Sequence, residues 1–362
     1  MVVSDAHVPL ADAHVLPDAR VLADAGPPLR GCFEGDLEIE GRSSLVRVNG
    51  IVGYDGGWIV FGQEPTRATA IFLSREGHWS GRYDYAESES QVTEFLLSGN
   101  SVYAFGPNSL VRFDIGDRTF SRVYDRAELE RTTVGRLGDG FRAVGLLLFR
   151  GATPRITDIT PDDESPTGVR MITGVMPSVD FLEESVYPAS VSIVEDHIQV
   201  RHAEGPSAAS MRVVDVQLGA PPGGDGSVGI RVWTTTSVPW NHALITMASD
   251  ASRWVGTTRA TLETDRVVEV VGRDRTWPLL RGVVVRGWEE SAGRYVALTN
   301  NALHVFRASD VASLGMETTF EATEGAWPKL AVTGEFAATA FERSRDSAGP
   351  RFAVRCVQLP TL

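Results

Sequence analysis

Short apolar runs separated by turn residues fill the chain from residue 31 onward, and helical periodicity is nearly absent there. Residues 57–75 (GWIVFGQEPTRATAIFLSR) contain an apolar run, a turn with glycine, and a second run in which apolar and polar residues alternate. Residues 100–115 (NSVYAFGPNSLVRFDI) repeat this pattern. Because side chains of a strand point alternately to its two faces, the pattern predicts β-strands joined by tight turns.

The leading run of this pair recurs along the chain at spacings of 43, 40, 44, 56, 52 and 42 residues. A further strand follows each copy and several copies are trailed by another, so we interpret the recurring run as the second strand of four. The longest step contains a loop insertion around residues 220–229. The copies begin at Trp58, Ser101, Phe141, Ser185, Asn241, Gly293 and Glu335.

A repeated unit of this size resembles the β-propeller repeat superfamily, with its kelch-like and quinoprotein-like architectures. Residues 31–362 number 332, which gives about 47 residues for each of seven units. The resemblance implies an all-β fold, a seven-bladed β-propeller of four-stranded antiparallel blades. The chain has no Trp-Asp dipeptide closing a unit and no kelch Gly-Gly set, so no subfamily motif carries a function across. Six or eight blades and a pair of β-sandwiches are the alternatives.

Residues 1–30 have a different character, because an Asp-Ala unit recurs at Asp5, Asp12, Asp18 and Asp24 and prolines interrupt any helix. This composition predicts a disordered Asp/Ala/Pro-rich tether in front of a propeller domain at residues 31–362. The tail resembles the tethers of bacterial surface lipoproteins. That resemblance implies an extracytoplasmic location, at the bacterial cell surface or in the periplasm, with membrane contact only through a lipid anchor upstream of the chain. The alternative is a low-complexity tail without such a role.

The two cysteines of the chain, Cys32 and Cys356, lie at opposite ends of the predicted domain. Cys356 falls in the third strand of the last unit, and residues 32–40 alternate apolar and acidic side chains as the missing fourth strand would. The N-terminal strand is then expected to complete the last blade and close the ring. Neighbouring strands can bring two cysteines within disulfide distance, so we predict a Cys32–Cys356 disulfide; two buried free thiols are the alternative.

Composition narrows the function only slightly. The formal net charge of −13 argues against a nucleic-acid partner, because an acidic surface repels phosphate backbones. The chain has 34 lysines and arginines, of which only Lys329 is a lysine, a skew that a high-GC genome explains. No apolar run approaches the length that spans a bilayer.

Motifs for catalysis, metal binding or cofactor binding are missing from the sequence. It has no Gly-x-Ser-x-Gly, His-Glu-x-x-His or Cys-x-x-Cys. A Gly-x-Gly-x-x-Gly at Gly224, Gly226 and Gly229 runs into a strand instead of a helix, so we interpret it as a loop between units. The histidines are scattered, and the acidic clusters do not match a Ca²⁺ loop. We therefore expect no catalytic residues, no metal and no cofactor.

The two ends of the predicted sheets differ in their loop residues. The turns between first and second strands lack arginine, whereas the connections between second and third strands carry arginine and asparagine, which suit recognition of carboxylates, sugars or peptide backbone. We predict a ligand-binding mouth at the face that carries the connections between second and third strands. Its candidate residues are Arg67, Asn108, Arg150, Arg253, Asn300, Asn301 and Arg343.

The function that fits best is a monomeric, non-catalytic recognition scaffold that binds a protein or a glycan. A propeller enzyme acting on carbohydrates or lactones is the main alternative, and it would need paired carboxylates or a metal at the mouth. A structural part of an envelope assembly is a third hypothesis, which a large exposed apolar patch would support.

Overall fold

The computed structural model describes several stretches of the chain between Cys32 and Leu362. The predicted tether, residues 1–30, lies outside them. Within these ranges, no helix has the length and apolar character that crossing a bilayer requires. The described ranges are 32–39, 45–65, 67–85, 94–105, 109–125, 132–137, 140–145, 155–161, 169–175, 188–194, 197–203, 210–218, 230–239, 242–247, 253–258, 266–272, 275–323, 327–347 and 349–362.

The described strands pair into seven antiparallel sheets of four strands each. The first strands are β2 (Arg47–Tyr54), β6 (Glu94–Ser98), β10 (Thr132–Leu137), β14 (Pro188–Val194), β18 (His242–Met247), β22 (Val285–Ser291) and β26 (Lys329–Thr333). The second strands are β3 (Gly57–Gln63), β7 (Ser101–Phe105), β11 (Gly140–Gly145), β15 (His197–Ala203), β19 (Arg253–Thr258), β23 (Arg294–Thr299) and β27 (Phe336–Asp346).

The outer half of each sheet follows the same order. The third strands are β4 (Ala68–Ser74), β8 (Ser109–Asp114), β12 (Arg155–Pro161), β16 (Ser210–Leu218), β20 (Val267–Gly272), β24 (Ala302–Arg307) and β28 (Gly349–Gln358). The fourth strands are β5 (Trp79–Tyr85), β9 (Thr119–Asp125), β13 (Val169–Val175), β17 (Ile230–Pro239), β21 (Thr276–Arg281), β25 (Ser313–Thr319) and β1 (Asp36–Glu38).

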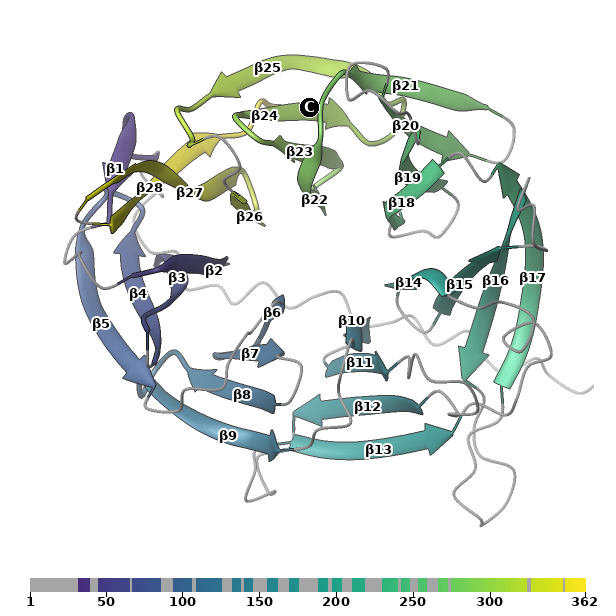
Figure 1. Ribbon diagram of the computed structural model, residues 1–362, viewed down its shortest axis with the longest axis horizontal. Coiled ribbons are helices and arrows are strands. Elements are labelled where there is room, and N and C mark those ends of the chain that lie inside the picture. The colour runs from purple at the N-terminus through teal and green to yellow at the C-terminus, as the bar shows by residue number, and fades with distance from the viewer. Residues whose placement is uncertain are drawn as a thin grey trace, which may run out of the picture.

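Figure 1 shows these sheets around a central axis, with the first strands innermost and the fourth strands on the outside. Neighbouring first strands contact each other, β2 with β6 and β26, and β26 with β22. The predicted all-β class and the four-stranded antiparallel sheets are confirmed in the described part of the chain.

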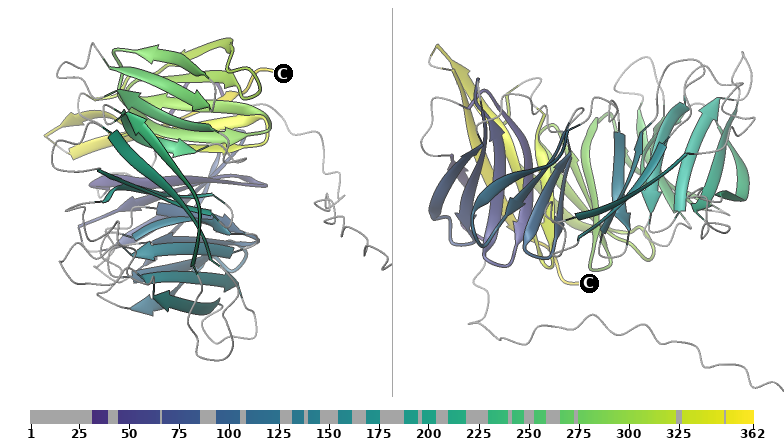
Figure 2. Two further views of the ribbon diagram at one scale, coloured as in Figure 1. Left: turned by 90° about the vertical axis from the view of Figure 1, so that its right-hand side faces the viewer. Right: turned by 90° about the horizontal axis from the view of Figure 1, so that it is seen from below.

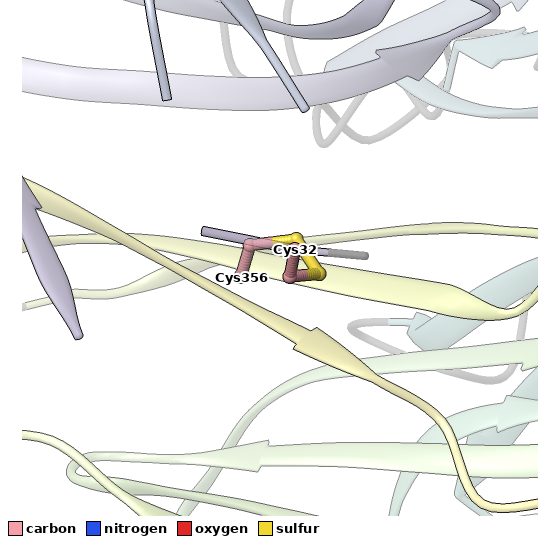
Figure 3. Close-up of a disulfide and its surroundings, with 2 residues drawn as sticks. All are labelled: Cys32 and Cys356. Carbon is pink, nitrogen blue, oxygen red and sulfur yellow. A yellow bond between two sulfur atoms is a disulfide. The ribbon is translucent and has the colours of Figure 1, made fainter. Parts of the chain in front are cut away.

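One sheet joins the two ends of the described chain. β1 pairs antiparallel with β28, with Asp36 opposite Arg355, and these two side chains also form an ion pair. Next to this pairing, Cys32 and Cys356 form the predicted disulfide, with Cα atoms 5.4 Å apart (Figure 3). The sheet of β26, β27 and β28 thus takes its fourth strand from a segment more than 300 residues away in the sequence.

The continuous apolar run of β3 reflects burial on both faces of its sheet. Trp58 and Val60 are buried in a cluster with residues of β27 and β28, whereas Ile59 and Phe61 lie in a second cluster with residues of β7 and β8. Alternate residues of the strand therefore contact different neighbouring sheets. A strand covered on both faces has an unbroken apolar sequence, and this made the second strands recognisable.

Two glycines of β2 let its neighbours approach closely near the axis. A Cβ atom on Gly50 would lie 2.2 Å from Cδ2 of Phe95, whose ring stacks on Phe61 with centroids 4.5 Å apart. A Cβ atom on Gly53 would lie 2.8 Å from Cγ2 of Thr333 in β26. The innermost strand thus has no room for larger side chains at these two positions.

Two of the predicted second strands occupy a different position in their sheets. The runs at Ser185 and Asn241 lead into β14 and β18, which are first strands; the second strands are β15 and β19. An apolar run marks a buried strand but does not say which of the inner strands it is. The motif of Gly224, Gly226 and Gly229 lies outside the described residues, and it connects the paired strands β16 and β17 of one sheet instead of two units.

Candidate ligand-binding face

The strand order defines two faces of the ring. We call the face with the turns between second and third strands the top face, and the face with the turns between first and second strands the bottom face. Every first strand begins at the top face, because its far end leads into a bottom turn. In the right-hand view of Figure 2 the β27–β28 hairpin extends upward at the top face, and the C-terminus lies at the bottom face.

Four of the predicted ligand residues lie at the top face. Arg67 precedes β4, Asn300 and Asn301 form the turn between β23 and β24, and Arg343 lies near the end of β27. All four are exposed. Two further candidates, Asn108 and Arg150, lie outside the described residues, in connections between second and third strands.

Arg253 is not in the predicted location. It is the first residue of β19, a second strand, and so lies at the bottom face. Its guanidinium donates to the carbonyls of Ala308 (2.7 Å) and Ser309 (3.2 Å) and lies 5.1 Å from the ring centroid of Trp277. The assignment to the top face followed from the shifted strand at Asn241. In the structure Arg253 ties two neighbouring sheets together.

Arg67 belongs to a network of four charged side chains at the top edge of the first sheet. It forms ion pairs with Glu64 (2.5 Å) and Asp84 (3.1 Å), and Arg82 pairs with both carboxylates. Burial raises the pKa of Asp84, but the hydrogen bonds from Thr69 and Arg82 and the charges of Arg82 and Arg67 outweigh it, so the pKa is lowered overall. The charges of the two arginines and two carboxylates compensate each other. The guanidinium of Arg67 is therefore paired within its own sheet.

A second group at the top face was missed by the sequence reasoning. Trp327, which leads into β26, is 69% exposed. The guanidinium of Arg286 lies 4.3 Å from the centroid of the Trp327 ring and donates from Nε to Oδ1 of Asn300 at 2.6 Å. The predicted residue Asn300 therefore orients an arginine that covers one face of an exposed tryptophan.

Two more cations lie beside this group at the same end of the innermost strands. Lys329 is the first residue of β26 and Arg47 is the first residue of β2, and these strands contact each other. Burial, and then the nearby charge of Arg47, lower the pKa of Lys329. The residues at the start of each first strand share the top face with the connections between second and third strands. The same reasoning applied to those residues identifies both Trp327 and Lys329.

Three acidic side chains at the top face are paired with arginines. Glu64 and Asp84 are held in the network of Arg67, and Glu342 accepts two hydrogen bonds from Arg345, at 2.7 and 2.9 Å. In the described part of the chain, no three histidine, cysteine, aspartate or glutamate side chains come together as a metal-binding group.

No protein-family model and no curated protein match the sequence. Solved structures do resemble the fold. One is the β-propeller domain of the Trilobed protease from Pyrococcus furiosus, with a TM-score of 0.53, 11% identity, and coverage of 88% of this chain and 98% of that chain. Another is the N-terminal domain of Nup159, with a TM-score of 0.52, 8% identity, and coverage of 91% and 98%.

A third similar structure is streptogramin B lyase, with a TM-score of 0.50, 11% identity, and coverage of 89% of this chain and 97% of that chain. These structures are β-propellers, and the chain has the β-propeller fold. They include a lyase and a domain of a protease. At this level of identity the likeness extends to the fold alone, and function has to be argued from the site.

Proposed function

We propose that this protein is a non-catalytic, extracytoplasmic recognition scaffold that binds a glycan at the top face of a seven-bladed propeller. In this proposal the seven sheets of the described chain are all of its blades, β1 closes the ring, and the protein acts as a monomer. The Cys32–Cys356 disulfide favours an oxidising compartment, as does the tether-like composition of residues 1–30.

The observation that carries the proposal is the exposed but oriented indole of Trp327. A large apolar side chain left in water loses the free energy that burial would supply, roughly 2 kcal/mol for a side chain of this size. Trp327 is nevertheless held in place, because Arg286 stacks on it and Asn300 fixes Arg286. An exposed aromatic side chain with polar neighbours is typical of a recognition site.

A glycan fits this arrangement better than the alternatives. The indole face carries partial negative charge and attracts the polarised C–H groups of a sugar ring, while Asn301 and the arginines can bond to hydroxyl groups. A propeller enzyme would need unpaired carboxylates at the mouth, and three described carboxylates of the top face, Glu64, Asp84 and Glu342, are tied to arginines.

The test is binding of the full chain to immobilised neutral and acidic saccharides, with Trp327→Ala as the probe variant. We expect at least one saccharide to bind and Trp327→Ala to weaken that binding by about 10-fold or more. Leu362→Ala is the matched control, because Leu362 is a large apolar residue, 58% exposed, at the bottom face. Equal effects of the two substitutions, or capture of no saccharide at all, would refute the proposal.

A further inference from the structure

The chemistry of the top face also indicates which glycans would bind, an inference that rests on the proposed function. We propose that the site selects saccharides carrying carboxylate or sulfate groups, with Trp327 as the stacking surface and Lys329, Arg47 and Arg286 as the cations that bind the anionic groups. We refer to these four residues as the top-face cluster.

The cluster is built on three consecutive innermost strands. Arg286 is the second residue of β22, while Lys329 and Arg47 are the first residues of β26 and β2. β22 contacts β26, and β26 contacts β2. All three strands begin at the top face, so their first residues lie at the same end of the ring. Figure 1 shows β22, β26 and β2 as neighbouring innermost strands beside the axis.

The charge of the three basic side chains in the cluster is opposite to that of the whole protein. The chain carries a formal net charge of −13, yet the cluster presents three cations. Among the described residues, no carboxylate forms an ion pair with Lys329, Arg47 or Arg286; the partners recorded for Arg286 are the neutral Asn300 and Trp327. By contrast, Arg67 and Arg345 on the same face are paired with carboxylates.

Uncompensated cations held close together are unfavourable unless an anion joins them, and Lys329 shows this effect. It is partly buried, and the like charge of Arg47 adds to the disfavour of its protonated form. An anionic group placed between β26 and β2 would relieve both effects. Arginine and lysine are also the side chains that make charge-assisted hydrogen bonds to carboxylate and sulfate oxygens.

The stacking surface distinguishes a saccharide from an acidic peptide. Of the three large apolar side chains exposed in the described chain, Trp327 and Val46 lie at the start of β26 and β2, beside the cations. Arg286 covers one face of the Trp327 ring, and the side chain is still 69% exposed. A pyranose ring can stack on the remaining indole surface while its charged substituent reaches Lys329 or Arg47.

The experiment compares matched pairs of probes on the full chain: dextran sulfate against dextran, and oligogalacturonate against the corresponding neutral galactan. We expect at least one charged member to bind about 10-fold or more tightly than its neutral parent at low salt, with an affinity that falls as salt is added. Lys329→Met and Arg47→Gln should each weaken the charged member by about 10-fold, and Lys329→Arg should retain most of the affinity.

Arg307→Gln is the control for the loss of a positive charge, because Arg307 is a bottom-face residue paired with Asp310 at 2.9 Å. Its affinity should equal that of the unmodified protein, and circular dichroism would verify that every variant is folded. Equal affinity for charged and neutral members, lost in Trp327→Ala, would overturn this inference and leave the proposed function standing. No binding of any saccharide would overturn both.

Two other outcomes would also contradict the inference. Salt-dependent binding that survives both Lys329→Met and Arg47→Gln would locate the anion site elsewhere. Binding of poly-glutamate with an affinity equal to that of the charged saccharides, and unaffected by Trp327→Ala, would identify an acidic peptide as the class of ligand.

Discussion

Removal of the disulfide that links the segment before β1 to β28 should strongly destabilise the fold. Cys32 and Cys356 are separated by 324 positions, so the bridge closes a very long loop in the unfolded chain. In the chain-entropy model the loss is about 2.1 + 1.5R ln n cal/mol/K, which for a loop of this length is roughly 19 cal/mol/K, or about 6 kcal/mol at 25 °C. Such a loss is a large part of the 5–15 kcal/mol typical of whole proteins.

The remaining contacts of β1 are few, which adds to the expected effect. The strand has three residues, and besides its ladder with β28 it is held by the Asp36–Arg355 and Glu38–Arg351 ion pairs, by the packing of Leu37 and by the burial of the adjacent Ile39. In the double variant Cys32→Ser, Cys356→Ser these contacts alone hold β1 against β28, so the loss of the bridge should appear as a lower stability of the whole ring.

The assay is urea denaturation followed by circular dichroism for the oxidised protein, the reduced protein and the double variant. With a denaturant slope of about 3 kcal/mol/M, the reduced protein and the variant should unfold about 2 M urea earlier than the oxidised protein. Reductant should leave the variant unchanged. Coincident curves for all three samples would refute the reasoning, because the bridge would then not constrain the unfolded chain.

Three smaller predictions concern the pairing of β1 with β28, the close approach at Gly50 near the axis, and Lys329 of the top-face cluster. Asp36→Asn should lower the free energy of unfolding by about 1–2 kcal/mol, since Arg355 loses its charged partner; an unchanged denaturation midpoint would contradict this. Gly50→Ala should cost about 1–3 kcal/mol by forcing the ring of Phe95 away from β2, and a melting temperature equal to that of the parent would argue against the close approach. The lowered pKa of Lys329 means that the unfolded state binds more protons, so the free energy of unfolding should rise with pH between the folded pKa and the unfolded value of about 10.4. The Lys329→Met variant should lack that rise, and parallel pH profiles would show that no such shift exists.

The sequence predicted the strand class and most of the repeat because second strands are buried on both faces. The runs at Trp58, Ser101 and Phe141 stood out as continuous apolar segments and do occupy equivalent positions in their sheets. The disulfide could be predicted because the last unit lacks a fourth strand and residues 32–40 have the pattern of one. Pairing the two places Cys32 beside Cys356. At Ser185 and Asn241, the two ends of the longest spacing, the same criterion selected first strands, because burial alone does not fix a strand's position.

The candidate site was predicted less well, for a geometric reason. Asn300 and Asn301 do lie at the top face, but Arg67 is neutralised within its own sheet and Arg253 lies at the bottom face. Which arginine has a carboxylate beside it depends on pairing across strands, and the sequence alone does not give that register. Trp327 was overlooked because only turns within sheets were considered, although each first strand also begins at the top face.

The most direct test of the proposed site uses the single lysine of the chain as a probe. Growth on isotope-labelled lysine would label only Lys329, so NMR would follow one side chain without any mutation. Addition of oligogalacturonate should shift its ε-ammonium signals and raise its pKa, because a bound carboxylate stabilises the charged form, while neutral galactan should leave the pKa where it was. Signals and a pKa that stay constant in the presence of every charged saccharide would contradict the assignment of the site to the starts of β22, β26 and β2.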